Sequence, residues 1–215
     1  MLDNKKKAKF CQSPFPYFNI EYDSKKRFCS YWHQINEIVS LKPNKVLDVG
    51  IGNGFVSSYL DDKGNDVTTL DVAHELLPNV TGSVLAIPFK STTFDVVSCY
   101  EVLEHMPYRE FNMALKELSR VSKRHIILSL PDATAVYRLN IELPRIKPVK
   151  KLIHHPWPRS KHHKCNSEHY WEIGKTGYRL NKIKFDIIGL GFNIIKSYRV
   201  YEYYRHRFFL LEKIV

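Results

Sequence analysis

The chain lacks the features that mark membrane and secreted proteins. No stretch of its 215 residues approaches the roughly 18 consecutive apolar residues that a membrane-spanning helix needs. The first ten residues, MLDNKKKAKF, contain no apolar stretch of the signal-peptide kind. The four cysteines show no paired spacing, so they predict reduced thiols and not a disulfide framework. These absences predict no membrane span and favour a cytoplasmic protein.

Motifs of nucleic-acid enzymes are also missing, although the charge is strongly basic. We find no NPPY-type tetrad and no recognisable RNA-binding module. The formal net charge is nevertheless +11, and residues 138–184 hold twelve Lys or Arg against three Glu. A concentrated basic region suggests an anionic partner, such as phosphate, nucleic acid or an acidic membrane surface. A solvated surface that keeps the protein soluble explains the same charge, so both interpretations stay open.

Hydrophobic periodicity predicts alternating strands and helices. Apolar strand patterns cover 45–49, 66–70, 80–85, 94–100 and 125–130, and helical patterns cover 24–41, 54–63 and 109–122, with a further helix starting at 101–106. This order is typical of a parallel sheet with crossover helices. A last helix over 178–190 and strands over 192–201 and 208–213 follow, and these two strands can pair antiparallel. We expect a basic N-terminal segment over 1–23 and a single domain over 24–215.

Residues 132–177 interrupt this order. They are rich in Pro, Lys, His and aromatic residues, with weak periodicity, which predicts an insertion that lies over the sheet edge as a lid on the active site. His154, His155, His162, His163 and Cys165 fall within it. Their spacing matches no CxxC-type zinc site, so a solvated basic loop is the preferred interpretation of this cluster.

The stretch VLDVGIGNG, residues 46–54, predicts a ligand loop directly after a buried strand. Doubly wound folds bind ligands at this edge of the sheet, and glycines let the backbone approach a ligand closely. The spacing Gly50-x-Gly52-x-Gly54 departs from the dinucleotide fingerprint, whose third glycine would fall on Phe55. Asp71 ends the next strand, where ribose hydroxyls bind. Asp48 suits a ligand with ammonium and sulfonium groups, so the loop predicts a nucleoside site without a pyrophosphate turn.

Four motifs in this order resemble the class I S-adenosylmethionine-dependent methyltransferases, most closely their type 11 branch. They are VLDVGIGNG, TTLDV, GSVLAIPF and FDVVSCYEVLEH. The resemblance implies a Rossmann-like methyltransferase fold: α/β, with a doubly wound seven-stranded, mostly parallel sheet and a final antiparallel strand. It also implies S-adenosylmethionine as the cofactor. The branch usually has Asp at the position of Ser83, and serine can also accept a hydrogen bond.

The resemblance gives the matching residues roles in cofactor binding. It implies that Asp48, Gly50 and Gly52 hold the methionine part, Asp71 binds the ribose, Val72, Ser83 and Val84 lie against the adenine, and Glu101 faces the methionine end.

Glu101, Glu104 and His105 share one helical face and can bind Mg²⁺ or Mn²⁺ with His169. This is similar to metal-dependent O-methyltransferases acting on quinone-precursor phenols and small-RNA 2′-hydroxyls. The same EVLEH pattern is frequent in the branch without a metal, where it serves packing and hydrogen bonding, and we favour that interpretation.

Methyl transfer needs an aligned nucleophile, and a base only if that nucleophile is protonated. The catalytic candidates are His169, Glu101 and His105, with Glu172 as a further acid–base residue.

Trp32 is expected in the core, with its neighbours Tyr31 and His33 toward solvent. The candidate substrate contacts are Tyr31, His33, Trp157, Tyr170, Trp171 and Arg205.

Three functions follow from these patterns. The first is a methyltransferase acting on O or N of a small or anionic acceptor. The second is an RNA methyltransferase, of the metal-dependent 2′-O type or another, that uses the basic insertion as its phosphate contact. The third is a non-catalytic module that binds S-adenosylmethionine. Neither the acceptor nor the oligomeric state follows from the sequence.

Overall fold

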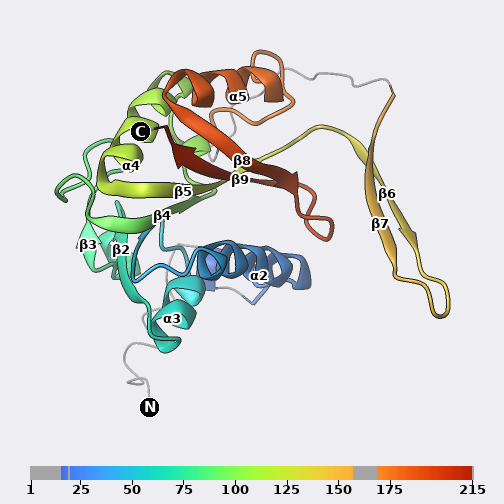
Figure 1. Cartoon of the computed structure of the whole chain (residues 1–215), viewed down its shortest axis with the longest axis horizontal. Helices are drawn as coiled ribbons and strands as arrows, with labels where there is room; N and C mark the ends of the chain where they lie inside the picture. Colours follow the sequence, from blue (N-terminus) through green and yellow to red (C-terminus); the bar gives the residue numbers. More distant parts are fainter. Residues whose placement is uncertain (1–15, 19, 157–168, 215) are drawn as a thin grey trace.

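A computed structural model describes residues 16–18, 20–156 and 169–214. Its main sheet has seven strands in the order β3-β2-β1-β4-β5-β9-β8 (Figure 1). β9 pairs antiparallel with both of its neighbours, and the remaining pairs are parallel. The predicted fold class is confirmed. The strands are β1 (Lys45–Val49), β2 (Asp66–Asp71), β3 (Val80–Thr81), β4 (Phe94–Tyr100), β5 (Ser122–Pro131), β8 (Phe192–Arg199) and β9 (His206–Lys213).

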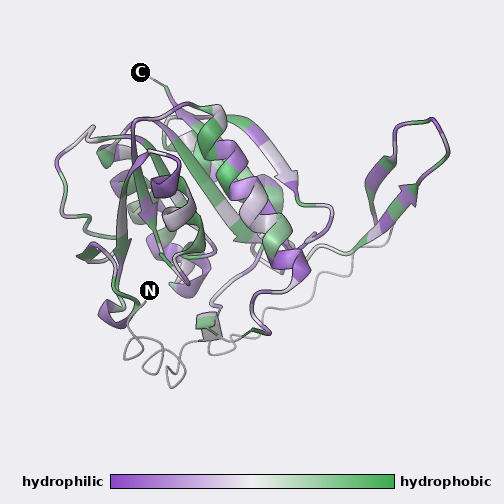
Figure 2. Ribbon diagram, turned by 90° about the horizontal axis from the view of Figure 1, so that it is seen from below, coloured by the Kyte–Doolittle hydropathy of each residue, from purple (hydrophilic) through white to green (hydrophobic). Residues whose placement is uncertain are grey.

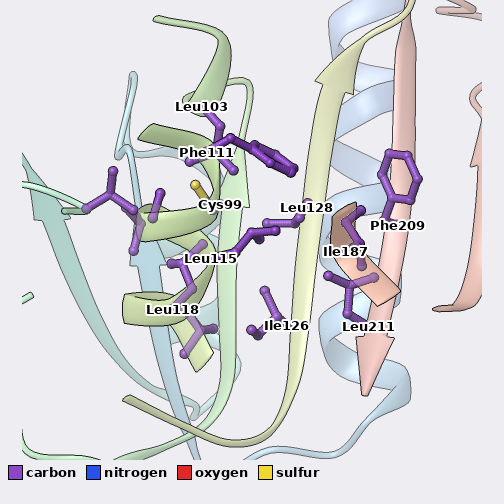
Figure 3. Close-up of a cluster of buried hydrophobic side chains, with 14 of the residues drawn as sticks. Cys99, Leu103, Phe111, Leu115, Leu118, Ile126, Leu128, Ile187, Phe209 and Leu211 are labelled. Atoms are coloured by element: carbon purple, nitrogen blue, oxygen red, sulfur yellow. The ribbon is translucent and has the colours of Figure 1, made fainter. Parts of the chain in front are cut away.

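Helices cover both faces of this sheet, so the core has two halves (Figure 1). α2 (Lys25–Ser40) and α3 (Phe55–Asp62) pack on one face, and α4 (Phe111–Val121) and α5 (Leu180–Gly189) pack on the other. Successive strand residues point to opposite faces: Ile127 packs with the α2 side and Leu128 with the α4 side. Figure 3 shows the α4 side, where side chains of α4 and α5 meet those of β5 and β9.

Two regular elements that the sequence predicts are shortened or replaced by turns. The predicted strand over 80–85 pairs only at Val80–Thr81, because Ser83 Oγ accepts a hydrogen bond from Leu85 N at 3.2 Å and turns the chain back. The predicted helix from 101 is only a turn, because Glu101 has a left-handed φ of 52°. The 3₁₀ turns are η1 (Pro16–Phe18), η2 (His74–Leu76), η3 (Leu103–His105) and η4 (Tyr108–Glu110).

The rotation of α2 about its axis differs from the prediction. Ser24 caps the helix, with its Oγ accepting from Arg27 N at 3.4 Å. Tyr31, predicted to face solvent, is buried with Gln34 and Ile38, which lie at helical spacing on one face. Trp32, predicted in the core, is 59% exposed. The apolar character of Trp32 therefore does not identify the face of α2 that packs against the sheet.

The predicted insertion begins with a second sheet of two strands, β6 (Val136–Ile141) and β7 (Val149–His154). Figures 1 and 2 show this hairpin extending away from the main sheet, whereas the prediction put the insertion over the sheet edge. Residues 169–177 lie against the main sheet, where Ile173 bridges to Asp132. His162, His163 and Cys165 lie outside the described residues.

In the described part of the chain, no helix combines the length and the apolar character that crossing a bilayer requires.

Candidate functional site

A cavity of about 440 Å³ opens at the carboxyl ends of β1, β2 and β4. The loops after three adjacent strands line it, as in other doubly wound sheets. Ten residues that the sequence analysis selected contribute to its wall: Tyr31, Asp48, Gly50, Gly52, Asp71, Val72, Ser83, Val84, Glu101 and His105. The structure thus brings together all the residues predicted to hold a cofactor.

The glycine loop has the backbone that its sequence predicts. Gly50, Gly52 and Gly54 have φ values of 87°, 54° and 75°, a region that side chains disfavour. A Cβ on Gly50 would lie 2.3 Å from Val102 Cγ2, so any side chain at this position would clash with Val102. A Cβ on Gly52 would meet nothing nearer than Tyr17 Cδ1 at 4.0 Å. The loop therefore leaves open space beside Gly52, where a ligand can approach the backbone.

Two carboxylates flank this loop in different environments. Asp48 is buried, and its Oδ1 accepts a hydrogen bond from Ser98 Oγ at 2.8 Å. Burial raises the pKa of Asp48 to about 6. Asp71 accepts from Ile51 N at 3.0 Å and from Ala73 N at 2.9 Å. A carboxylate has about four lone-pair sites, so Asp71 can tie the loop to β2 and still accept from two ligand hydroxyls.

Arg27 is a cavity residue that the sequence analysis missed. Its guanidinium lies 3.8 Å from the centre of the Tyr22 ring, and its Nε is buried with no hydrogen-bond partner among the described residues. Among the described lining residues Arg27 is the only Lys or Arg, against three carboxylates. It precedes Tyr31 by one helical turn, and that spacing on the buried face was the signal available in the sequence.

An acidic and histidine-rich cluster forms the end of the site beyond β4. Glu104 is fully buried, and neither carboxylate oxygen has a hydrogen-bond partner among the described residues. His169 Nε2 lies 4.0 Å from Glu104 Oε1, and His169 Nδ1 lies 3.0 Å from Glu172 Oε1. Burial and the neighbouring Glu101 raise the pKa of Glu104 well above its usual value. One candidate ligand atom from each of Glu104, His105 and His169 lies within 4.8 Å of the others, which is a spacing that a metal ion can bridge.

Glu101 connects this cluster to the cavity. Burial raises its pKa to about 7, and its Oε1 has no hydrogen-bond partner in the described part of the chain. Its Oε2 lies 3.6 Å from His206 Nε2, and the other ring nitrogen of His206 is 2.9 Å from Ser30 Oγ. Burial lowers the pKa of His206 to about 3, so the ring is neutral at pH 7. His206, and not the predicted Arg205, therefore reaches the site.

The structure places four other predicted substrate contacts away from the cavity wall. Trp171 is completely buried in the core, with its Nε1 donating to Met106 O at 3.2 Å. Tyr170 is 49% exposed and faces solvent. His33 lies 3.2 Å from Tyr198 Oη, on the β8 side of α2, and Arg205 is exposed, with its carbonyl accepting from Asp132 N. Trp157 lies outside the described residues.

Comparison with known proteins agrees with this geometry. A family model described as a methyltransferase domain matches residues 47–129. The ubiquinone biosynthesis O-methyltransferase of Stutzerimonas stutzeri is 34% identical over 88 residues, covering 34% of this chain and 38% of that protein. The malonyl-[acyl-carrier protein] O-methyltransferase of Erwinia billingiae is 31% identical over 126 residues, covering 51% and 49%. The chain thus spans less than half the length of these curated relatives.

Solved structures extend the likeness over nearly the whole chain. The 1,6-didemethyltoxoflavin-N1-methyltransferase of Burkholderia thailandensis has a TM-score of 0.62 at 13% identity, covering 92% of this chain and 82% of that one. The magnesium protoporphyrin IX methyltransferase of Synechocystis has a TM-score of 0.59 at 16% identity, covering 98% and 94%. Both were solved with S-adenosylhomocysteine bound. Residues 47–129 thus match a methyltransferase domain, of the type 11 family, and the solved structures show that the chain as a whole has the fold of S-adenosylmethionine-dependent methyltransferases.

Proposed function

We propose that this protein transfers the methyl group of S-adenosylmethionine to an oxygen or nitrogen atom of a small acceptor. The observation that carries the proposal is the cavity itself. One end combines a glycine loop with the two carboxylates Asp48 and Asp71, and the other end adjoins the Glu104–His169 cluster. A nucleoside and a proton acceptor can therefore occupy adjacent parts of one site.

The cavity residues fit the parts of the cofactor. Asp71 would accept from the ribose hydroxyls, Val84 and Ser83 would lie beside the adenine, and the open space at Gly52 would admit the amino-acid part. Asp48 and the unpartnered Glu101 Oε1 suit its ammonium group, and Arg27 suits its carboxylate. When bound, S-adenosylmethionine supplies a methyl group on a positively charged sulfur, which is electrophilic without further activation.

We assign to His169 the removal of a proton from the acceptor. His169 is not itself among the residues that line the cavity, but its ring centre lies 5.1 Å from that of His105, which is. An ionised Glu172 carboxylate can only accept a hydrogen bond, so it favours the tautomer with the proton on His169 Nδ1. Nε2 is then left with a lone pair on the side of Glu104 and His105. A hydroxyl or ammonium group that binds there can lose its proton to Nε2 before attack.

Oxygen is the acceptor atom that the curated relatives favour. Both relatives described above are named O-methyltransferases. A hydroxyl is protonated at neutral pH and gains from a base such as His169. The spacing of Glu104, His105 and His169 also allows a divalent cation in place of a direct proton transfer. Sensitivity of transfer to a chelator therefore distinguishes the two mechanisms.

The affinity for S-adenosylhomocysteine is expected to rise as pH increases from 5 to 7. The pKa of Asp48 is about 6 because the carboxyl is buried. Below that pH Asp48 is protonated and loses its attraction for the ligand's ammonium group; above it the carboxylate is charged. Calorimetric titrations below the pKa of Asp48 should show that the affinity rises by up to about tenfold for each pH unit. In Asp48→Asn the part of this pH dependence that is centred near pH 6 should be lost, while the part due to Glu101, whose pKa is about 7, remains. A profile identical to that of the wild type would contradict the assignment.

The function is tested in two stages on protein freed of carried-over ligand. S-adenosylmethionine and S-adenosylhomocysteine should bind with measurable heat and raise Tm, as expected for ligands that bind only the folded state. Transfer of a labelled methyl group is then assayed on phenols, amines and an RNA fraction, with and without a chelator. We expect transfer to a small phenol or amine, and chelator sensitivity would assign the cluster to a metal.

His169→Ala separates binding from transfer. It should leave cofactor affinity nearly unchanged and reduce transfer by about a hundredfold or more, which is the usual contribution of a general base. His33→Ala is the matched control, because His33 lies away from the cavity. Transfer to RNA alone would favour the second function, and cofactor binding without transfer to any acceptor would favour a binding module. Absence of binding would reject the proposal.

A further inference from the structure

The β6–β7 hairpin projects from the body of the protein (Figure 1). In the described part of the chain its two strands pair only with each other, in a sheet of their own. Figures 1 and 2 show it extending from the body of the protein in both views. None of its residues contributes to the cavity described above. The hairpin therefore takes no part in lining the proposed cofactor site.

One face of the hairpin touches the turn between β8 and β9. Lys150 Nζ lies 2.9 Å from Glu202 Oε1, and the Arg138 guanidinium lies 5.6 Å from the centre of the Tyr204 ring. In the register of the hairpin, Asn140 is opposite Lys150 and lies on the same face as Arg138. The polar face is thus the one turned toward the protein.

The other face of the hairpin is apolar and open to solvent. Tyr137, Leu139 and Ile141 alternate along β6, and Ile153, Lys151 and Val149 stand opposite them in β7. Tyr137 is 56% exposed and Ile153 is 47% exposed. This arrangement inverts the usual one, in which a sheet turns its apolar face inward. An exposed continuous apolar face of this kind marks an interaction surface.

The tip of the hairpin continues the apolar face. Ile146 N donates to Leu143 O at 3.2 Å, which closes a turn with Pro144 in its second position and Arg145 at a φ of 65°. Leu143 is 55% exposed and Ile146 is 60% exposed. The proline restricts the backbone of the turn. Two branched aliphatic side chains are therefore presented at the far end of a projecting element.

The charge of the hairpin selects the chemistry of the partner. Residues 136–154 contain five Lys or Arg and one Glu. Two hairpins of this charge repel each other, which disfavours a second copy of the chain as the occupant. Nucleic acid would match the charge, but it accepts aliphatic side chains only at thymine methyl groups or between unstacked bases, and most of its contacts with proteins are polar. An anionic lipid surface accepts both, because basic residues bind its headgroups while apolar side chains enter the region below them.

We propose that the β6–β7 hairpin docks this protein on the surface of a membrane that contains anionic phospholipids. Leu143 and Ile146 enter the interface at the tip, and Lys147 and Lys151 contact the headgroups. This is peripheral binding and does not require a membrane-spanning helix. The proposal does not depend on the proposed methyl transfer, because the cavity and the hairpin share no residue.

The test is co-sedimentation of the full chain with vesicles of phosphatidylcholine, with and without phosphatidylglycerol. We expect binding to the vesicles that contain phosphatidylglycerol, and weakening by salt. Leu143→Ser combined with Ile146→Ser should reduce this partition by at least about tenfold. Lys147→Glu combined with Lys151→Glu should reduce it by at least about fivefold per residue.

A matched control removes two exposed apolar residues elsewhere. Phe185→Ser combined with Ile188→Ser changes α5, where the two side chains are 75% and 55% exposed, and should leave vesicle binding unchanged. Far-ultraviolet circular dichroism and Tm show that each variant is folded. If the wild type binds neither kind of vesicle, the proposal is overturned, whatever else the hairpin binds. Equal binding by the tip variant and the wild type, or equal loss in the α5 control, also overturns it.

Discussion

Asp71→Ala is expected to weaken the binding of S-adenosylhomocysteine by at least about tenfold. Asp71 performs two tasks in the proposed complex. It accepts hydrogen bonds from Ile51 N and Ala73 N, which shape the glycine loop, and it retains lone pairs for the ribose hydroxyls. A hydrogen bond to a charged group contributes about 1.5–3 kcal/mol, and 1.4 kcal/mol is a factor of ten. Isothermal titration calorimetry measures the loss directly.

An analogue of S-adenosylhomocysteine without the ribose hydroxyls separates these two tasks. In the wild type the analogue should bind more weakly than the parent ligand. In Asp71→Ala the two ligands should bind with nearly equal affinity, because the group that distinguishes them is gone. If the affinities for the analogue and for the parent ligand differ as much in the variant as in the wild type, Asp71 only shapes the loop. The assignment of Asp71 to the ribose is then wrong. Asp66→Ala, on the exposed start of the same strand, is the control.

Arg27→Met should weaken the binding of S-adenosylhomocysteine by about ten- to a hundredfold and leave the binding of methylthioadenosine nearly unchanged. The second ligand has the same nucleoside but no amino-acid group. Arg27 is the only Lys or Arg among the described cavity residues, and its Nε has no hydrogen-bond partner there. Methionine keeps much of the side-chain length that packs over Tyr22 while removing the charge. Loss of one charge-assisted pair to the ligand carboxylate accounts for the expected range.

Lys26→Met provides the control for this comparison, since the neighbouring side chain is exposed and outside the cavity. Its affinity for both ligands should match the wild type. An equal loss of both ligands in Arg27→Met would mean that Arg27 supports the wall formed by Tyr22 and does not bind the carboxylate. Preserved affinity for S-adenosylhomocysteine would remove Arg27 from the site.

The parts of the fold that follow from local sequence were predictable. β1 and β4 have the predicted boundaries because each is a short, mainly apolar run with polar or turn-forming residues before it and after it. The glycine loop was predictable because its three positive φ angles need glycine, whatever the rest of the chain does. The order of these motifs along one sheet then brings Asp48, Asp71 and Glu101 to one edge.

The parts that depend on distant contacts were not predictable. Trp171 is buried because the segment after the hairpin pairs with the end of β5, at Asp132 and Ile173. No local pattern specifies that pairing, so Trp171 and Tyr170 could not be divided between core and solvent beforehand. His206 reaches Glu101 because β9 enters the sheet beside β5 in a particular register. The separation of these residues in the sequence conceals their proximity.

The two ends of the projecting hairpin meet at its base, where His155 N donates to Ala135 O at 3.1 Å. The hairpin is thus closed at its base, and none of the hydrogen bonds of the seven-stranded sheet runs through it. Such an appendage can be gained, lost or exchanged during evolution without rebuilding the domain that carries it. The residues of the hairpin and the residues that line the cavity can therefore change independently among related proteins.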